Sequence, residues 1–228
     1  MQLKGCVLAV LCFHMLASLT SASRCVMRSH CGHDEDLDKD IPCKVNDEPK
    51  ALSPSGRGLF SEVCPDLAAT TGPDHLTCCD VEQLRALKED LQQPIDLGMK
   101  DYPRCLRNFR NIFCQLVCSP KQSDFVKVVS SENKAQGLPY VKKAVYAVSE
   151  RFAKGSYDSC KDVKVKKDRN LMSFMCGWNC DLTKWFTFMG STAPEGGYSP
   201  YNIQFHITKD STVKLNGTEL RPMNVSLA

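Results

Sequence analysis

Cysteine is the residue type whose number and spacing are most informative about the chemistry of this sequence. The 228 residues include 14 cysteines, two of them in an apolar N-terminal run and 12 after it. An even number in an oxidising compartment is typical of a fully paired disulfide framework. Cys114-x-x-x-Cys118 and Cys176-x-x-x-Cys180 could also ligate metal, but structural zinc sites favour shorter spacings and a matching second pair. We therefore expect disulfides and no metal site.

Signatures of the common enzyme classes are missing from the sequence. It contains no Gly-x-Ser-x-Gly elbow, no His-Glu-x-x-His pair and no phosphate-binding glycine loop. If every cysteine is paired, no thiolate remains as a nucleophile. A hydrolase that uses scattered carboxylates stays open as an alternative, because two such groups can converge in a pocket. We predict no enzyme activity, no catalytic residue and no cofactor.

The N-terminus has the three-part pattern of a secretory signal peptide. Lys4 gives the positive start, residues 6–19 are almost wholly apolar, and a Ser-Ala-Ser triplet at 21–23 suits cleavage. The sequence has no other stretch that is long and apolar enough to span a bilayer. We therefore expect residues 1–23 to be removed and residues 24–228 to form a single domain of the secretory pathway.

Two further features agree with a lumenal or extracellular domain. Asn-x-Ser/Thr triplets begin at Asn216 and Asn224, and in the secretory pathway both would carry glycans on an exposed surface. The formal net charge is only +3. Proteins that bind nucleic acid usually carry a strongly basic face, so we expect no nucleic-acid partner.

Apolar periodicity predicts three long helices. The first follows Asp80, a capping residue, and should stop at Pro94. The second covers residues 103–118, where apolar side chains make one broad face. The third covers residues 138–156, in which valines and a phenylalanine recur at helical spacing.

The other segments are shorter, and their pattern completes the fold class. We expect little regular structure in residues 25–64, which are acidic and rich in proline. The remaining expectations are a strand at 124–130, a basic turn or strand at 161–169, short helices at 171–175 and 183–189, and a strand at 201–208. The sequence therefore predicts an α+β fold: one disulfide-rich domain, with several helices packed on a small sheet around an apolar ligand pocket.

Large apolar side chains gather late in the chain and suggest such a pocket. They include Phe174, Met175, Trp185, Phe186 and Phe188. Disulfides can hold a frame around a cavity that packing alone would collapse. A sterol suits such a cavity, because it needs apolar walls and one polar end for its hydroxyl. The alternative is that these side chains only form an ordinary core.

Two motifs connect the sequence with a known family. CCDVEQLRALK at 78–88 and NIFCQLVCSP at 111–120, with Pro94 between them, closely resemble the N-terminal domain of the Niemann-Pick C type 1 family. The likeness extends from Cys25 to Asn224 and looks closest to an invertebrate or gut paralogue.

This resemblance implies a lumenal sterol-binding domain in sterol uptake and transfer. Its ligand would come from the soluble Niemann-Pick C type 2 carrier and pass to a multi-span membrane region beyond this chain. The chain would then be a fragment of a larger protein of the endolysosomal or plasma membrane, monomeric as an isolated domain. The pairing that the resemblance implies is Cys25 with Cys78, Cys31 with Cys43, Cys64 with Cys114, Cys79 with Cys118, Cys105 with Cys160, and Cys176 with Cys180.

The resemblance also implies which residues meet the sterol. Gln83 matches the glutamine that bonds the sterol hydroxyl, and an amide has both donors and an acceptor. Periodicity alone favours a different interpretation, an exposed polar position on the helix. The other implied positions in the pocket, on its rim or in the helix at its mouth are Met27, His30, Ala86, Leu87, Asp90, Phe113, Met175, Trp185, Phe188, Pro200 and Tyr201.

The polar end of the pocket departs from the family pattern. Pro42 stands where the family has an asparagine, His30 replaces an acidic residue, and Met27 replaces a tryptophan. Proline offers no side-chain hydrogen bond, so the hydroxyl must find other partners. We expect these changes to alter the preference among sterols rather than the binding of sterols as a class.

Two other functions remain open for a domain with this disulfide framework. Folate and riboflavin carriers resemble this family and share a Cys-x-x-x-Cys-Ser-Pro stretch like that at 114–120. Their planar, charged ligands call for stacked tryptophans, and the mature chain has only Trp178 and Trp185. An adhesion module without a ligand would instead show a large exposed apolar patch and no closed pocket.

Overall fold

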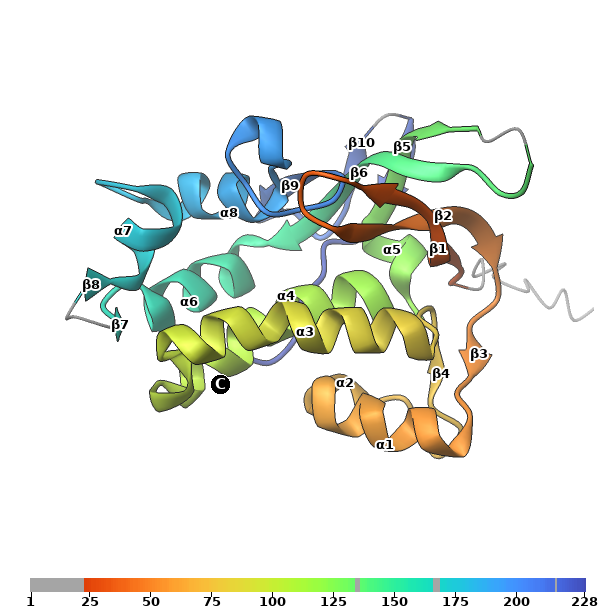
Figure 1. Ribbon diagram of the computed structural model, residues 1–228, viewed down its shortest axis with the longest axis horizontal. Coiled ribbons are helices and arrows are strands. Elements are labelled where there is room, and N and C mark those ends of the chain that lie inside the picture. Colours follow the sequence, from red (N-terminus) through yellow and green to blue (C-terminus); the bar gives the residue numbers. More distant parts are fainter. Residues whose placement is uncertain (1–22, 134–135, 166–168, 216) are drawn as a thin grey trace, which may run out of the picture.

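A small mixed sheet and two layers of helices make up the fold, which confirms the predicted α+β class (Figure 1). The computed structural model describes residues 23–133, 136–165, 169–215 and 217–228. Its helices are α1 (Pro54–Val63), α2 (Pro65–Ala68), α3 (Val81–Leu97), α4 (Pro103–Cys118), α5 (Gln122–Phe125), α6 (Glu150–Cys160), α7 (Leu171–Cys176) and α8 (Leu182–Gly190). Its strands are β1 (Cys25–Asp34), β2 (Lys39–Asp47), β3 (Lys50–Ala51), β4 (Leu76–Thr77), β5 (Val126–Glu132), β6 (Tyr140–Ser149), β7 (Lys164–Val165), β8 (Arg169–Asn170), β9 (Asn202–Thr208), β10 (Val213–Leu215) and β11 (Thr218–Leu220).

Strand β6 is the centre of the main sheet. One of its edges pairs antiparallel with β5, from Val126 opposite Tyr146 to Glu132 opposite Tyr140. Its other edge pairs in parallel with β9 and, at Tyr140, meets Cys43 of β2. Strand β1 then pairs antiparallel with β2. The β1–β2 ribbon thus extends the sheet past the end of β9.

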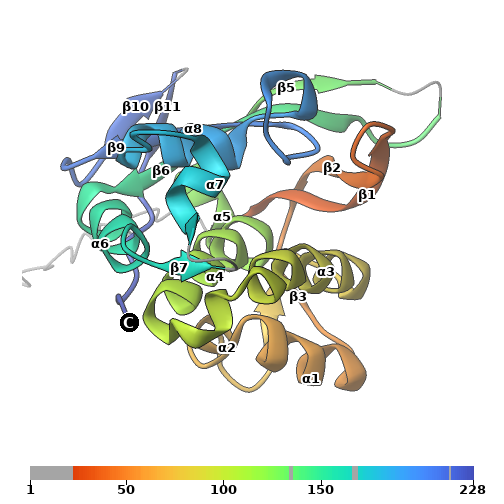
Figure 2. The same cartoon turned by 60° about the vertical axis from the view of Figure 1, so that its left-hand side comes forward.

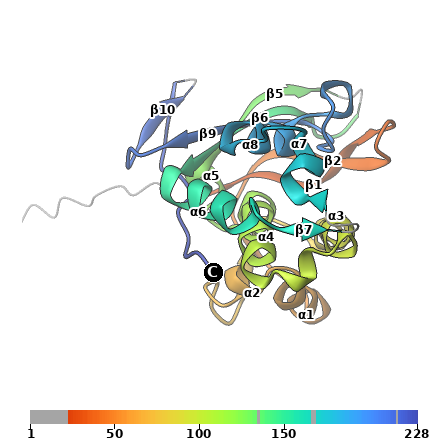
Figure 3. The same cartoon turned by 90° about the vertical axis from the view of Figure 1, so that its left-hand side faces the viewer.

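Helices α1 to α4 lie in two layers below the sheet. In Figure 3, α3 and α4 occupy the middle of the molecule, with the sheet above them and α1 and α2 below. Figure 2 shows α7 and α8 beside the sheet, across from the β1–β2 ribbon, with α3 below. This arrangement places α3, α4, α7, α8 and the β1–β2 ribbon around one space.

Helix α3 begins where the sequence predicts and ends later. Asp80 accepts a hydrogen bond from the backbone N–H of Gln83, and the Gln83 side chain bonds back to the N–H of Asp80, which completes a capping box. The expected stop at Pro94 is wrong, because the helix continues to Leu97. A proline so near the end removes only one helical hydrogen bond. Gly98, at a φ of 117°, makes the actual stop in a left-handed conformation.

The second predicted helix, residues 103–118, is confirmed as α4. Pro103 stands at its first turn, where the missing N–H has no helical partner to lose. Phe109, Ile112 and Leu116 recur at helical spacing and are all buried. The short helices expected at 171–175 and 183–189 and the strand expected at 201–208 are also present, as α7, α8 and β9. The strand expected at 124–130 begins two residues later, because α5 takes the residues before it.

The helix expected over residues 138–156 is wrong. Residues 140–149 form β6, and α6 follows, with Ser149 accepting a hydrogen bond from the Phe152 N–H. Residues 144–148 are all buried, because layers of the protein cover both faces of this strand. A strand buried on both faces is a continuous apolar run, and such a run also satisfies helical spacing.

The expectation of little regular structure in residues 25–64 is also wrong. This segment forms β1, β2, β3 and α1. The register of the β1–β2 ribbon shifts three times, so its apolar residues do not alternate as in a regular strand. Helix α1 does carry a local signal, since Ser53 caps it and Pro54 occupies its first position.

The described residues form six disulfides, of which four link segments that lie at least 39 residues apart in the sequence. Two adjacent bridges fix the start of α3: Cys25–Cys78 joins it to β1, and Cys79–Cys118 joins it to the end of α4. The others are Cys64–Cys114 from α1 to α4, Cys105–Cys160 from α4 to α6, Cys31–Cys43 within the β1–β2 ribbon, and Cys176–Cys180 between α7 and α8. These are the same six pairs that the resemblance implies. By restricting the unfolded chain, a bridge over a long loop contributes about 2–4 kcal/mol.

Some sequence predictions fall on residues outside the described part. These are the signal peptide at 1–23, of which only Ser23 is described, the sequon residue Asn216, and part of the basic segment at 161–169. Asn224, the other sequon residue, is exposed. Within the described ranges, no helix combines the length and apolar character needed to cross a membrane.

A candidate ligand cavity between the sheet and the helices

A cavity of about 540 Å³ lies between α3, α4, α7, α8, the β1–β2 ribbon and the segment before β9. Helix α3 forms one wall, because Gln83, Ala86, Leu87 and Asp90 are spaced three, one and three residues apart. That spacing keeps all four on one face of a helix. The polar residues stand at either end of this row, and the apolar ones lie between them.

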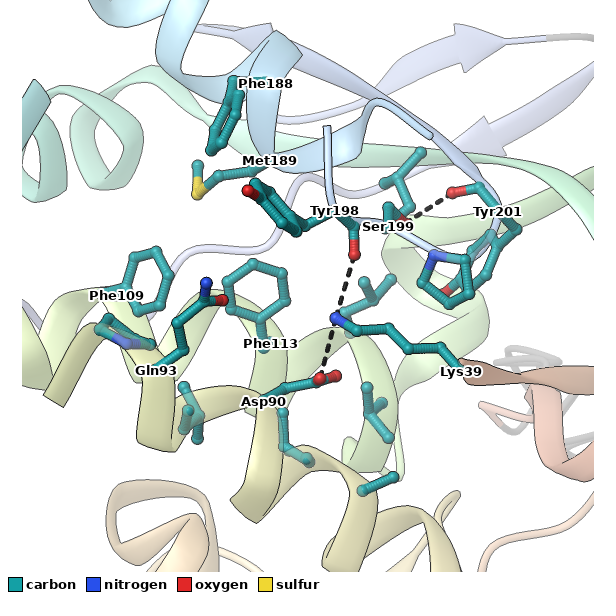
Figure 4. A pocket seen from close by; sticks show the side chains of 18 of the residues that line it. Lys39, Asp90, Gln93, Phe109, Phe113, Phe188, Met189, Tyr198, Ser199 and Tyr201 are labelled. Atoms are coloured by element: carbon teal, nitrogen blue, oxygen red, sulfur yellow. Dashed lines mark hydrogen bonds and ion pairs between the residues drawn. The ribbon is translucent and has the colours of Figure 1, made fainter. Parts of the chain in front are cut away.

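Aromatic and apolar side chains of α4 form the next wall. Phe109 and Phe113 are one turn apart, and their rings meet edge to face with centroids 5.2 Å apart. Leu116 and Val117 continue the same surface towards the end of the helix. Figure 4 shows Phe109 and Phe113 side by side along the cavity. This wall offers an extended apolar contact to a rigid ligand.

Helices α7 and α8 cover the cavity opposite α3. Met175, Phe188 and Met189 project into it, and the Phe188 ring packs against the Tyr198 ring with centroids 6.0 Å apart. Phe188 and Met175 also line a shallower depression on the outer side. These two side chains therefore stand between the cavity and this depression.

An ion pair crosses the space between β2 and α3. Lys39 Nζ lies 2.8 Å from Asp90 Oδ1 and donates a hydrogen bond of 3.1 Å to the backbone carbonyl of Tyr198 (Figure 4). Three segments that are distant in the sequence are joined in this way across the rim. Asp90 was expected from the family resemblance, whereas Lys39 and Tyr198 were not, because no local pattern reveals a partner from another element.

Gln83 supplies a polar group at the other end of the α3 row. Its side chain is buried, and its Oε1 accepts hydrogen bonds from the backbone N–H groups of Ser29, at 2.9 Å, and Asp80, at 3.3 Å. Its Nε2 makes no hydrogen bond with any described residue. Since Gln83 lines the cavity, the amide has donors left for a ligand.

His30 and Asp40 lie on the β1–β2 ribbon, where His30 directly follows the Ser29 whose N–H bonds Gln83. His30 Nδ1 is 3.1 Å from Asp40 Oδ2, and both residues line the cavity. The other oxygen, Asp40 Oδ1, lies 3.1 Å from His33 Nδ1. The hydrogen bond to Asp40 raises the pKa of the His33 imidazole above its usual value. Pro42 pairs with His30 across the ribbon and also lines the cavity.

Tyr201 contributes a neutral polar group to the lining. Burial of its side chain raises the pKa of its phenol well above the usual value, so it stays protonated at physiological pH. Across the described ranges, His, Cys, Asp and Glu side chains nowhere gather in threes that could hold a metal ion.

Eleven of the twelve sterol-site residues implied by the resemblance line this cavity. They are Met27, His30, Gln83, Ala86, Leu87, Asp90, Phe113, Met175, Phe188, Pro200 and Tyr201. The exception is Trp185, which is fully buried on the face of α8 that packs against Phe109, Tyr157 and Phe186. Its ring belongs to the core behind the cavity, although Phe188 and Met189, three and four residues later on the same helix, line the cavity.

Comparison with known proteins identifies the family. The profile described as "Niemann-Pick C1 N terminus" matches residues 22–227. The chain belongs to this family. It is 35% identical over 188 residues to a Sus scrofa protein named NPC intracellular cholesterol transporter 1, which covers 78% of this chain and 14% of the relative. A Homo sapiens protein named NPC1-like intracellular cholesterol transporter 1 is 30% identical, over 90% of this chain and 15% of its own length.

A nematode relative is matched over a similarly small share of its own length. The Caenorhabditis elegans protein named NPC intracellular cholesterol transporter 1 homolog 1 is 32% identical over 73% of this chain and 13% of its own length. The chain thus spans about a seventh of the length of the curated relatives that it matches.

Proposed function

We propose that this domain binds one sterol molecule in the cavity, with the sterol hydroxyl at the Gln83 end. The observation that carries the proposal is an apolar cavity in which a buried amide keeps free donors at one end. A sterol is apolar over most of its surface and has one hydroxyl, which must be hydrogen-bonded when it is buried. The donors of Gln83 Nε2 meet that need.

The size of the cavity suits this ligand class. A volume of about 540 Å³ falls within the usual range of sites for small organic ligands. Burying about 400 Å² of apolar ligand surface would contribute on the order of 10 kcal/mol before the costs of association are subtracted. A folate or flavin would instead require buried charges or stacking tryptophans, and neither of the two tryptophans lines the cavity.

The relatives support a role in sterol transport. Their names describe cholesterol transporters, and this chain corresponds to about a seventh of their length. We propose that residues 1–23 are a signal peptide and that residues 24–228 act on the lumenal or extracellular side of a membrane, as part of a longer membrane protein. In this role the domain takes the sterol from a soluble carrier and passes it to the membrane region without catalysing a reaction.

The test of ligand class is direct binding to the disulfide-intact domain. A radiolabelled sterol should bind saturably with one site per chain, and folate or riboflavin in large excess should not displace it. Displacement by either competitor would favour the carrier alternative. Failure of all three to bind would remove the proposed function.

Substitution of Gln83 tests its role at the hydroxyl. Gln83→Ala should weaken sterol binding by about tenfold, because a buried hydroxyl would lose a partner. Since Gln83 also completes the capping box, Gln83→Glu is the better-matched variant. Glutamate keeps the acceptor for the Ser29 and Asp80 N–H groups and lacks the Nε2 donors. Both variants should lose affinity with the six disulfides intact, whereas unchanged affinity in both would exclude Gln83 from the site.

Phe188 is the side chain that we expect to control exchange of the ligand. It separates the cavity from the outer depression, so Phe188→Ala should speed sterol release by about tenfold. The control is Trp178→Ala, because Trp178 is 90% exposed on the neighbouring α7–α8 loop and does not line the cavity. Equal release rates in wild type and Phe188→Ala, followed with a fluorescent sterol, would place the gate elsewhere.

A further inference from the structure

The loop between α7 and α8 holds a tryptophan out into solvent. Trp178 is 90% exposed, more than any other large apolar side chain of the described residues. It is the middle residue of the loop that the Cys176–Cys180 bridge closes. Tyr157 Oη donates a hydrogen bond of 2.8 Å to the carbonyl of Cys180, which ties the base of this loop to α6. The indole is therefore presented by a fixed loop, and a partner that covers it orders little additional chain.

This tryptophan belongs to the same wall as the side chains at the edge of the cavity. Phe174, on the preceding α7, is 49% exposed and also lines the cavity, and the loop leads directly into α8, which carries Phe188. An aromatic side chain that projects from a loop suits insertion among lipid headgroups, where tryptophan is enriched. A protein partner would instead need a broad complementary surface of about 800 Å².

Basic residues are concentrated in the same part of the chain. Residues 161–184 include six lysines or arginines and three aspartates, so this short stretch has a net charge of +3, as large as that of the whole chain. Lys164, Arg169 and Lys184 are exposed, and none of them forms an ion pair with another described residue. Asp181 accepts a hydrogen bond from the backbone N–H of Lys184 as the cap of α8. The three cations therefore remain available to anionic headgroups.

The basic and aromatic groups lie at one end of the molecule. Strands β7 and β8 form a small hairpin that carries Lys164 and Arg169 and leads directly into α7, because Asn170 is the cap of that helix. Figure 1 shows α7 and both short strands together at the left-hand end of the view. A membrane surface that meets this end can contact the hairpin and the α7–α8 loop at once.

We propose that this end of the domain docks on an anionic phospholipid bilayer, with Trp178 at the level of the headgroups and Lys164, Arg169 and Lys184 close to their phosphates. Docking places the α7–α8 wall of the cavity against the membrane, so that a sterol moves between the cavity and the bilayer without crossing water. The docking itself does not depend on the ligand, whereas the transfer step rests on the proposed function.

Vesicle binding tests the docking. The disulfide-intact domain should co-sediment with vesicles of phosphatidylcholine and phosphatidylserine, and it should bind vesicles of phosphatidylcholine alone about tenfold more weakly. Trp178→Ala should lose about tenfold in affinity for the mixed vesicles, because the interfacial anchor is removed. The matched control is Leu138→Ala, since Leu138 is 53% exposed in the turn between β5 and β6, at the opposite end of the molecule. Equal binding of both vesicle types, or wild-type affinity in Trp178→Ala, would overturn the proposal.

Tryptophan fluorescence identifies the part of the surface that meets the membrane. The mature chain has two tryptophans, and Trp185 is fully buried, so a change of emission on vesicle binding reports on Trp178. The emission should shift to shorter wavelength with the mixed vesicles, and Trp178→Ala should show no shift. An unshifted wild-type spectrum with bound vesicles would place another surface on the membrane and overturn the proposal.

Removal of charge tests the basic contribution. Lys164→Gln combined with Arg169→Gln should weaken binding to the mixed vesicles by about tenfold, because two cations leave the contact. The matched control is Lys121→Gln combined with Lys214→Gln, since these exposed residues lie before α5 and in β10. This control should keep wild-type affinity. An equal loss in both double variants would show that the net charge, rather than this end of the domain, attracts the membrane.

Transfer of a fluorescent sterol from the loaded domain to the mixed vesicles tests the second step. The rate should rise with vesicle concentration in wild type and be about tenfold lower in Trp178→Ala, in line with its weaker docking, whereas release without vesicles should be the same in both. Equal transfer rates would show that the sterol crosses water. A domain that binds sterol but no vesicle would overturn this inference while the proposed function stands, and a domain that binds vesicles but no sterol would do the reverse.

Discussion

Ala86→Trp should abolish sterol binding and is the substitution with the largest expected effect on function. Ala86 lies on the cavity face of α3, between Gln83 and Asp90. An indole at this position would occupy the space of the ligand between α3 and the aromatic wall of α4. We expect affinity to fall by at least about a hundredfold, because a rigid ligand cannot share this space with a bulky side chain.

The same substitution on the outer face of α3 is the control. Glu89 is exposed and does not line the cavity, so Glu89→Trp should bind sterol as wild type does. Equilibrium binding of a radiolabelled sterol measures both variants, and circular dichroism checks that α3 still forms. Wild-type affinity in a correctly folded Ala86→Trp domain would place the ligand outside this cavity.

Gly190→Ala should cause the largest loss of stability among single substitutions near the cavity. Gly190 ends α8 where the helix crosses β9, and a Cβ there would come within 2.0 Å of the backbone oxygen of Ile203. Backbone cannot move aside as a flexible side chain can. Helix α8 would have to shift away from β9, and we expect the free energy of unfolding to fall by about 2–4 kcal/mol.

Binding should fall with stability in this variant, because Met189 and Ile203 line the cavity on either side of the contact. The control is Gly58→Ala in α1, where an added Cβ meets no atom within 4 Å. That change should be neutral or stabilise the fold by up to about 1 kcal/mol, since alanine favours a helix over glycine. Urea unfolding with the disulfides intact measures both. Equal stability of Gly190→Ala and wild type would show that α8 can move away from β9 at little cost.

The disulfides explain how a domain of this size keeps an open cavity. Well-packed interiors leave few voids, and an apolar cavity without its ligand tends to collapse. Here the bridges from α3 to β1 and from α3 to α4 fix two walls covalently, and Cys105–Cys160 fixes α4 to α6 behind them. The wall formed by α7 and α8 carries only its own local bridge, Cys176–Cys180. This difference in covalent linkage agrees with movement of the α7–α8 wall, which carries Phe188.

The sequence alone determined those parts of the protein whose signals are local. Helix α4 has its apolar face and its initial proline within residues 103–118. Helix α3 begins at a capping box formed by Asp80 and Gln83, which are only three residues apart. The alternation in β9 was similarly clear, because Ile203, Phe205 and Ile207 recur at every second position and pack against the core. The resemblance of two motifs added Gln83, which periodicity would have left as an exposed polar position on the helix.

The remaining features depend on contacts between distant segments, and they are visible only in the folded protein. Residues 140–149 became a strand since β5 and β9 pair with its two edges and layers cover both faces, a context that no local pattern contains. The same holds for the inward turn of Trp185, for the Lys39–Asp90 ion pair and for the contact of Asp40 with His30. Local sequence specifies which conformations a segment prefers, whereas the partner of a side chain is fixed only when the whole chain folds.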